Sequence, residues 1–69
     1  MDQWLNGSIL WIEQRRTGNG GQVCEVIYEL EGEPDSLRQM EIAAGDLYAG
    51  ARRGQSVAIN PALKRIRQR

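Results

Sequence analysis

The sequence contains no histidine, one cysteine and no phenylalanine among its 69 residues. Without an imidazole, a nucleophilic site of the Ser–His or Cys–His type is excluded. A zinc site would have to use carboxylates and a single thiol, an unusual ligand set. One cysteine also cannot form an intrachain disulfide, and we expect Cys24 to be a small core residue. We therefore expect a protein that is not an enzyme and that holds no cofactor and no metal.

Long apolar runs and export signals are missing as well. No stretch approaches the 18 apolar residues of a membrane span. The first residues, MDQWLNGS, lack the basic region and apolar core of a signal peptide. Use of a lone cysteine is typical of a reducing compartment. We expect a cytoplasmic protein with no membrane partner.

The length of the chain allows one domain, spanning residues 1–69. A chain this short buries about 60% of its unfolded surface, so its stability is small, and many such domains rely on a disulfide, a metal or a partner. Because a disulfide is excluded and the ligands for a metal are an unusual set, self-association is the expectation.

Glycine-rich turns and alternating strands dominate what is present. The segment TGNGG, residues 17–21, supplies the positive φ angles of a hairpin turn, so residues 7–31 are predicted to form a β-hairpin. In its second strand, Cys24, Val26, Tyr28 and Leu30 share one parity and face the core, whereas the glutamates mark the wet face. The glycine pattern lacks a Walker lysine and is a turn rather than a phosphate loop.

The rest of the chain predicts three further strands. Residues 31–36 are expected to form a turn, residues 37–42 a short strand, residues 43–54 a loop with one helical turn near 46–50, and residues 55–60 a strand. Residues 61–69 have two interpretations: a short helix capped by Asn60, or a tight turn at 61–63 and a closing strand with Ile66 inward. The second is favoured because it protects a sheet edge. The predicted fold is all-β: a small five-stranded SH3-like barrel or a curved antiparallel sheet.

The tail segment SVAINPALKRI, residues 56–66, resembles the last two strands of the plasmid-type dihydrofolate reductases. Those enzymes are SH3-like barrels that form tetramers around a central pore, which a Gln-Ile-Tyr triplet lines. At the matching positions this chain has Ala58, Ile59 and Asn60. The resemblance implies a strand, a turn and a strand, and the missing Gln and Tyr argue against the activity.

Charge is unevenly distributed although the net charge is zero. Residues 24–46 hold seven acids and one base, and residues 50–69 hold six bases and no acid. Either acidic and basic strands neutralise each other, or the two regions meet across copies, or the bases bind an anion. A positive groove with stacking aromatics is typical of small barrels that bind nucleic acid, although the near-neutral charge opposes it. The candidate contacts are Arg15, Arg16, Arg52, Arg53, Lys64, Arg65 and Arg67, with Trp11 and Tyr48 for stacking.

Bulky apolar residues also predict a protein interface. Trp11 has the parity of Ile9, opposite Leu10 and Ile12, so one face of that strand must expose large apolar groups. Trp4 either caps the open end of the barrel or packs on a partner. The candidate interface residues are Trp4, Trp11 and Tyr48. The sequence thus predicts a non-enzymatic interaction module that binds itself or another protein through apolar and complementary charged faces, with a nucleic-acid-binding barrel as the alternative.

Overall fold

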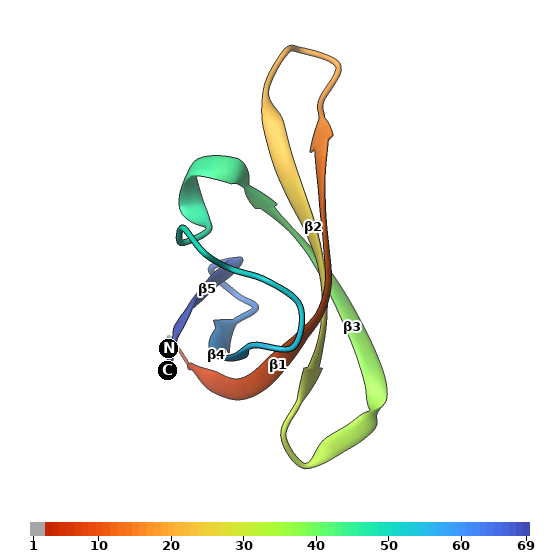
Figure 1. Ribbon diagram of the computed structural model, residues 1–69, viewed down its shortest axis with the longest axis vertical. Helices are drawn as coiled ribbons and strands as arrows, with labels where there is room; N and C mark the ends of the chain where they lie inside the picture. Colours follow the sequence, from red (N-terminus) through yellow and green to blue (C-terminus); the bar gives the residue numbers. More distant parts are fainter. Residues whose placement is uncertain (1–2) are drawn as a thin grey trace.

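The computed structural model describes residues 3–69, apart from the side chain of Pro34. Over these residues the chain forms five strands and one 3-10 turn: β1 (Leu5–Arg16), β2 (Gln22–Leu30), β3 (Glu33–Ala43), η1 (Ala44–Asp46), β4 (Ser56–Asn60) and β5 (Arg65–Gln68). All strand pairs are antiparallel, in the order β3-β2-β1-β4-β5 (Figure 1). The predicted all-β class is confirmed. Within the same residues no helix is long and apolar enough to cross a membrane.

The sheet is strongly curved and, over the part of the chain that the structure describes, is not closed into a barrel. β1 pairs with β2 along most of its length and with β4 through its first residues, Leu5 to Ser8. Figure 1 shows β1 bending where it changes partner, so that β4 and β5 fold back beside the loop that follows β3. β3 and β5 are therefore the two edges of the sheet. Of the two predicted forms, the curved sheet is the one found.

The hairpin predicted over residues 7–31 is present. The β1–β2 turn is closed by the Thr17 amide donating to the Gly21 carbonyl at 2.9 Å and by the Gly20 amide donating to the Thr17 carbonyl at 3.1 Å. Gly20 has a φ of 88°, which a side chain would oppose. In Figure 1 this end of the hairpin extends beyond the rest of the sheet.

The core lies on the concave side of the sheet. β2 alternates as predicted, with Cys24, Val26, Tyr28 and Leu30 buried. Every other strand contributes as well, and the buried aliphatic and sulfur-containing side chains are Ile9, Met40, Ile42, Val57, Ile59 and Ile66. Burying such a side chain stabilises the fold by about 1.5–3 kcal/mol before the entropy cost is counted. Cys24 is a core residue, as expected.

A β-bulge in β1 corrects the predicted orientation of Trp11. Ile9 pairs with Tyr28 and Trp11 pairs with Ile27, so Leu10 is an extra residue in β1. The bulge shifts the parity by one position: Ile9 and Ile12 face the core, whereas Trp11 faces outward. The assignment of Trp11 to the face of Ile9 was therefore wrong.

The predicted turn over residues 31–36 is shorter than expected. Gly32, with a φ of 85°, completes a tight connection after Glu31, and β3 already begins at Glu33. The rest of the predicted turn lies inside β3, where the pairing with β2 is irregular. Leu30 pairs with Glu33, whereas the preceding residue, Glu29, pairs with Leu37, so the register shifts between them. Met40 and Ile42 are buried, as predicted for the strand.

The tail forms a strand, a turn and a strand, as the resemblance implied, so the helical interpretation is wrong. The Lys64 amide donates to the Pro61 carbonyl at 3.3 Å, and the Asn60 side-chain oxygen accepts from the Leu63 amide at 3.1 Å. Asn60 thus ends β4 with a capped turn rather than starting a helix. Ile66 points inward with 3% exposure. The 3-10 turn lies at Ala44–Asp46, just ahead of the expected 46–50.

Candidate functional site

The convex face of the sheet exposes a band of large apolar side chains. The bulge turns Leu10 and Trp11 outward, where they are 38% and 44% exposed. Trp11 pairs with the half-buried Ile27 of β2. Leu37 of β3 is 66% exposed and pairs with Glu29, the next residue of β2 on the same face as Ile27. We call these residues — Leu10, Trp11, Ile27 and Leu37 — the outer band. Single exposed apolar residues are ordinary, but several side by side on one face are typical of an interface.

Arg53 is held against this band. The loop that carries it is fixed to β1 by the Gly54 amide, which donates to the Ile9 carbonyl at 2.7 Å, and by the Ile9 amide, which donates to the Gln55 carbonyl at 3.0 Å. The Arg53 guanidinium consequently lies 5.2 Å from the centre of the Trp11 ring. A cation–π contact at this exposure contributes about 0.5–1 kcal/mol.

Acidic side chains form a row next to the band. Glu13, Glu25 and Glu41 are paired across β1, β2 and β3, which places three like charges in one line. Arg15 relieves the repulsion, since its Nη2 lies 2.8 Å from Glu25 Oε2 and 3.4 Å from Glu41 Oε2. No group of His, Cys, Asp or Glu side chains within residues 3–69 is arranged to hold a metal ion.

Two other ion pairs neutralise part of the charge asymmetry. Arg65 lies 3.8 Å from Asp46, and Arg69 lies 2.9 Å from Glu31. Like the pairs of Arg15, these join a base outside residues 24–46 to an acid inside that segment. Two of the six bases of residues 50–69 are therefore neutralised by acids of residues 24–46 within the chain.

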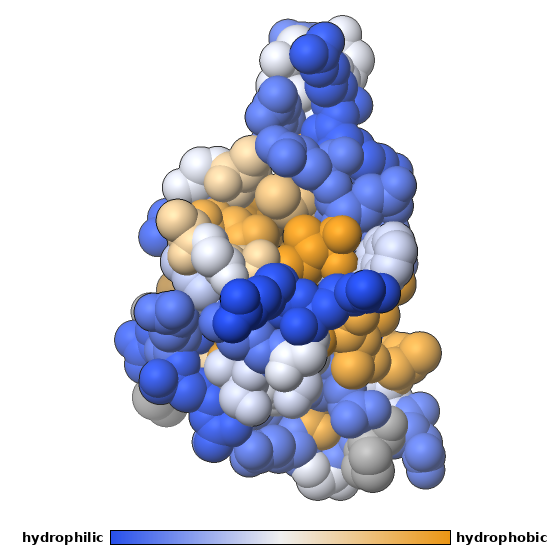
Figure 2. Space-filling model, in the orientation of Figure 1, coloured by the Kyte–Doolittle hydropathy of each residue, from blue (hydrophilic) through white to orange (hydrophobic). Residues whose placement is uncertain are grey.

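The basic residues considered for nucleic acid lie in three places. Arg15 and Arg16 end β1 on the extended hairpin, Arg52 and Arg53 are in the loop before β4, and Lys64, Arg65 and Arg67 are in the tail. In Figure 1 the end of the hairpin lies away from β5, so these groups do not share one groove. Figure 2 shows the hairpin end as hydrophilic and the middle of this side of the molecule as apolar surface crossed by hydrophilic residues.

The three predicted interface residues differ in exposure. Trp11 is exposed, whereas Trp4 and Tyr48 are half-buried. Arg67 covers Trp4, with its guanidinium carbon 4.1 Å from the ring centre. The Tyr48 hydroxyl donates to Gln55 Oε1. Burial raises the pKa of Tyr48, and the nearby Arg52 guanidinium partly opposes this rise.

Sequence reasoning missed the rest of the outer band. Ile27 has the parity of the outward-facing glutamates in β2, and Leu37 has the parity of Gln39 and Glu41 in β3. These two parities indicated that Ile27 and Leu37 are apolar residues on the solvent-exposed face. Ile27 and Leu37 lie near Trp11 only because of the register of β1, β2 and β3, and the sequence does not show that register.

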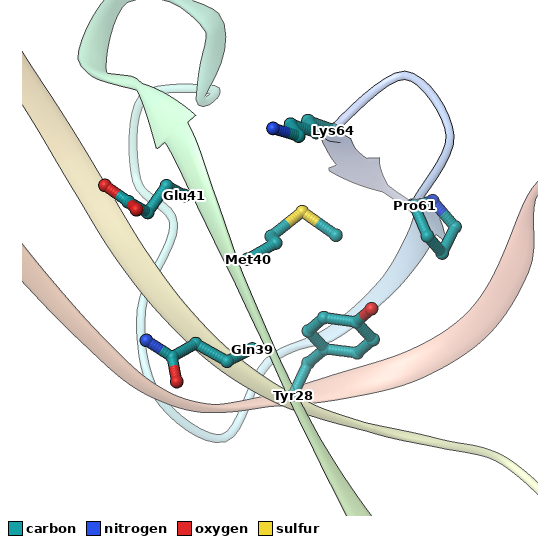
Figure 3. Close-up of a pocket in the computed structure, with 6 residues that line it drawn as sticks. All are labelled: Tyr28, Gln39, Met40, Glu41, Pro61 and Lys64. Atoms are coloured by element: carbon teal, nitrogen blue, oxygen red, sulfur yellow. The ribbon is translucent and has the colours of Figure 1, made fainter.

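A pocket of about 380 Å³ lies between the β3 edge and the β4–β5 turn (Figure 3). Its lining residues are Tyr28, Gln39, Met40, Glu41, Pro61 and Lys64. Burial raises the pKa of Tyr28, and the Arg38 guanidinium partly opposes this rise. Lys64 has a φ of 54°, the one positive φ of a non-glycine residue in the described chain.

The position that matches the pore tyrosine of the plasmid-type dihydrofolate reductases is Asn60, which is 0% exposed. This side chain therefore cannot line a pore surface in the folded chain. Comparison with known proteins found no matching family model, no curated relative and no similar solved structure.

Proposed function

We propose that this protein is a non-enzymatic interaction module that associates with a second copy of itself through the outer band. The observation that carries the proposal is the exposure of Trp11 and Leu37 on one face, with Ile27 between them. A bulge that turns a tryptophan away from the core of so small a domain loses apolar burial. Covering the band in a complex recovers that burial, at about 25 cal/mol for each Å².

A second copy fits this face because its two sides carry opposite charge. β3 contributes Asp35 and Glu41 on one side of the band, and Arg53 lies over Trp11 on the β1 side. A two-fold axis along β2, the middle of the three long strands, places the acidic side of one copy against the basic side of the other. Complementary charge of this kind fixes the orientation of a symmetric interface.

A dimer interface of ordinary size would cover a modest share of the surface of this chain. A standard interface covers about 800 Å² on each partner. That is about one sixth of the accessible surface of this chain, which totals 4770 Å².

Sedimentation velocity tests the proposal across protein concentrations of about 5–500 µM, a range that covers weak dimers. We expect a dimer whose population falls in a Trp11→Ala/Leu37→Ser double variant. The matched control is Leu63→Ser, which removes an equally apolar residue, 46% exposed, from the β4–β5 turn. A wild-type chain that stays monomeric throughout, or a control that dissociates as much as the double variant, would contradict the proposal.

Nucleic-acid binding is the second proposal, and the stacking of Arg53 on Trp11 favours it. The two groups together offer a flat surface for a base and a cation for the adjacent phosphate. Titration with a single-stranded oligonucleotide should then quench tryptophan fluorescence, with an affinity that falls steeply as salt rises. Loss of the signal in Arg53→Gln, with Arg38→Gln as the control, is the expected result. An unchanged spectrum at low salt would refute it.

We propose the cytoplasm as the location, because the free thiol of Cys24 is buried and fits a reducing compartment.

A further inference from the structure

The outer side of β3 offers backbone groups for pairing. β3 spans Glu33–Ala43 and pairs with β2 on one side. On its other side, no strand among residues 3–69 pairs with it. Unpaired amides and carbonyls on an edge strand are a template for an added strand.

The charges of β3 select what can be added. Glu33, Asp35 and Glu41 are the acids, and Arg38 is the base, 2.9 Å from Glu33. If two β3 strands paired antiparallel about Arg38, the arginines would face each other and Asp35 would face Glu41. Like charges directly opposite each other destabilise a sheet. In this register the edge disfavours β3 of a second copy, and three acids against one base along β3 favour a basic strand.

The pocket beside this edge provides a place for one apolar side chain. Tyr28 and Met40 form its inner wall, and Pro61 and Lys64 of the β4–β5 turn form the opposite wall. Figure 3 shows Met40 and Tyr28 directed toward that turn, whereas Gln39 and Glu41 point to the other side of β3. Because side chains alternate along a strand, an added strand that places one residue in the pocket places both neighbours beside Gln39 and Glu41.

We infer that the β3 edge binds an extended segment of another protein with a basic–apolar–basic pattern, which adds to the sheet as a strand and places its apolar residue in the pocket. Main-chain hydrogen bonds to β3 supply affinity, and the pocket and the acids supply specificity. The site uses the outer backbone edge of β3 and the pocket on the side of Tyr28 and Met40, whereas Leu37 of the outer band lies on the opposite face of the same strand, so the inference does not rest on self-association.

A fluorescein-labelled peptide of alternating arginine and isoleucine, seven residues long, tests the inference by fluorescence anisotropy. We expect binding with a Kd on the order of 10–100 µM. One control peptide replaces every arginine by glutamate, and another carries N-methyl groups on alternate amides, which blocks strand pairing but keeps the charge. Both should bind at least roughly tenfold more weakly, a difference of about 1.4 kcal/mol. Equal binding of the N-methylated peptide would overturn strand addition.

Two charge reversals on the protein locate the site. Glu41→Lys changes the β3 edge, whereas Glu13→Lys makes the same charge change in the same row but on β1, two strands away. We expect Glu41→Lys to weaken peptide binding about three- to fivefold more than Glu13→Lys. Circular dichroism verifies that both variants are folded. Equal weakening, or no binding at about 1 mM protein, would overturn the inference. A fraction of bound peptide that falls as the protein concentration rises would assign the edge to a second copy instead, and would also overturn it.

Discussion

Gly7 stands at the point where β1 changes partner, and its replacement by alanine is expected to be strongly destabilising. Gly7 is buried, and it pairs with Leu30 of β2 and with Val57 of β4. An added Cβ would overlap the Glu29 carbonyl oxygen and lie 2.9 Å from Cδ1 of Ile59. The isoleucine can rotate, but the carbonyl belongs to the backbone of the neighbouring strand, so the sheet itself must shift.

Overpacking of this kind costs about 1–3 kcal/mol, and a backbone collision belongs at the upper end of that range. A domain of this length has a total stability of roughly 3–10 kcal/mol. We therefore expect Gly7→Ala to lower the free energy of unfolding by about 2–3 kcal/mol and the Tm by about 10–20 °C.

Urea unfolding followed by tryptophan fluorescence measures this loss, at several protein concentrations because self-association raises apparent stability. The matched control is Gly45→Ala: no atom lies within 4 Å of the position of its Cβ, and its φ is not positive. Alanine at this position should be neutral or stabilise slightly. If the two variants unfold within about 0.5 kcal/mol of each other, the reasoning from backbone overlap is wrong.

Three further outcomes are expected. Lys64→Gly should raise the free energy of unfolding by about 0.5–1 kcal/mol in urea titrations, because a left-handed φ is unfavourable for lysine; a loss of stability would contradict this. Arg15→Ala should destabilise by up to about 1 kcal/mol at low salt and less at high salt, because Glu25 and Glu41 then face each other unrelieved; a salt-independent loss would count against the electrostatic explanation. Burial raises the pKa of Tyr28, so its neutral phenol contributes stability that is complete below its ordinary pKa near 10 and is lost as the pH rises through the folded-state value. Tyr28→Phe should therefore flatten the decline in stability above pH ~10 in chemical unfolding, and an unchanged decline would refute this assignment.

The sequence predicts the strands better than it predicts their relations. The alternation in β2 and the glycines of the β1–β2 turn are local signals, and both were interpreted correctly. The bulge at Leu10 inserts one residue in the middle of an apolar run, and an apolar run has no alternation from which the shift could be recognised. Trp11 was for this reason assigned to the wrong face.

The start of β3 shows a second limit. Pro34 and Asp35 are ordinary turn residues, yet Gly32 alone completes the connection through its positive φ. The remaining residues are accommodated by a register shift inside the strand. Local composition marks an irregularity here, but cross-strand pairing decides its position.

The candidate surfaces depend on contacts between distant segments. Arg15 reaches Glu41 from another strand, and Arg53 reaches Trp11 from a loop. Charge counting identified an asymmetry but not its local neutralisation. The hypothesis of a basic cluster therefore grouped residues that lie on several separate elements of the fold.

The contact of Arg67 with Trp4 joins the last strand of the described chain to the residue just before the first strand. β5 has four residues and Trp4 directly precedes β1, so each is held by few neighbours. Removing the residues up to Trp4 or the residues from Arg67 onward would consequently abolish the same contact. Both truncations should therefore loosen the same region. Hydrogen exchange should reveal this region as a single cooperative unit in which residues near Trp4 and near Arg67 open together.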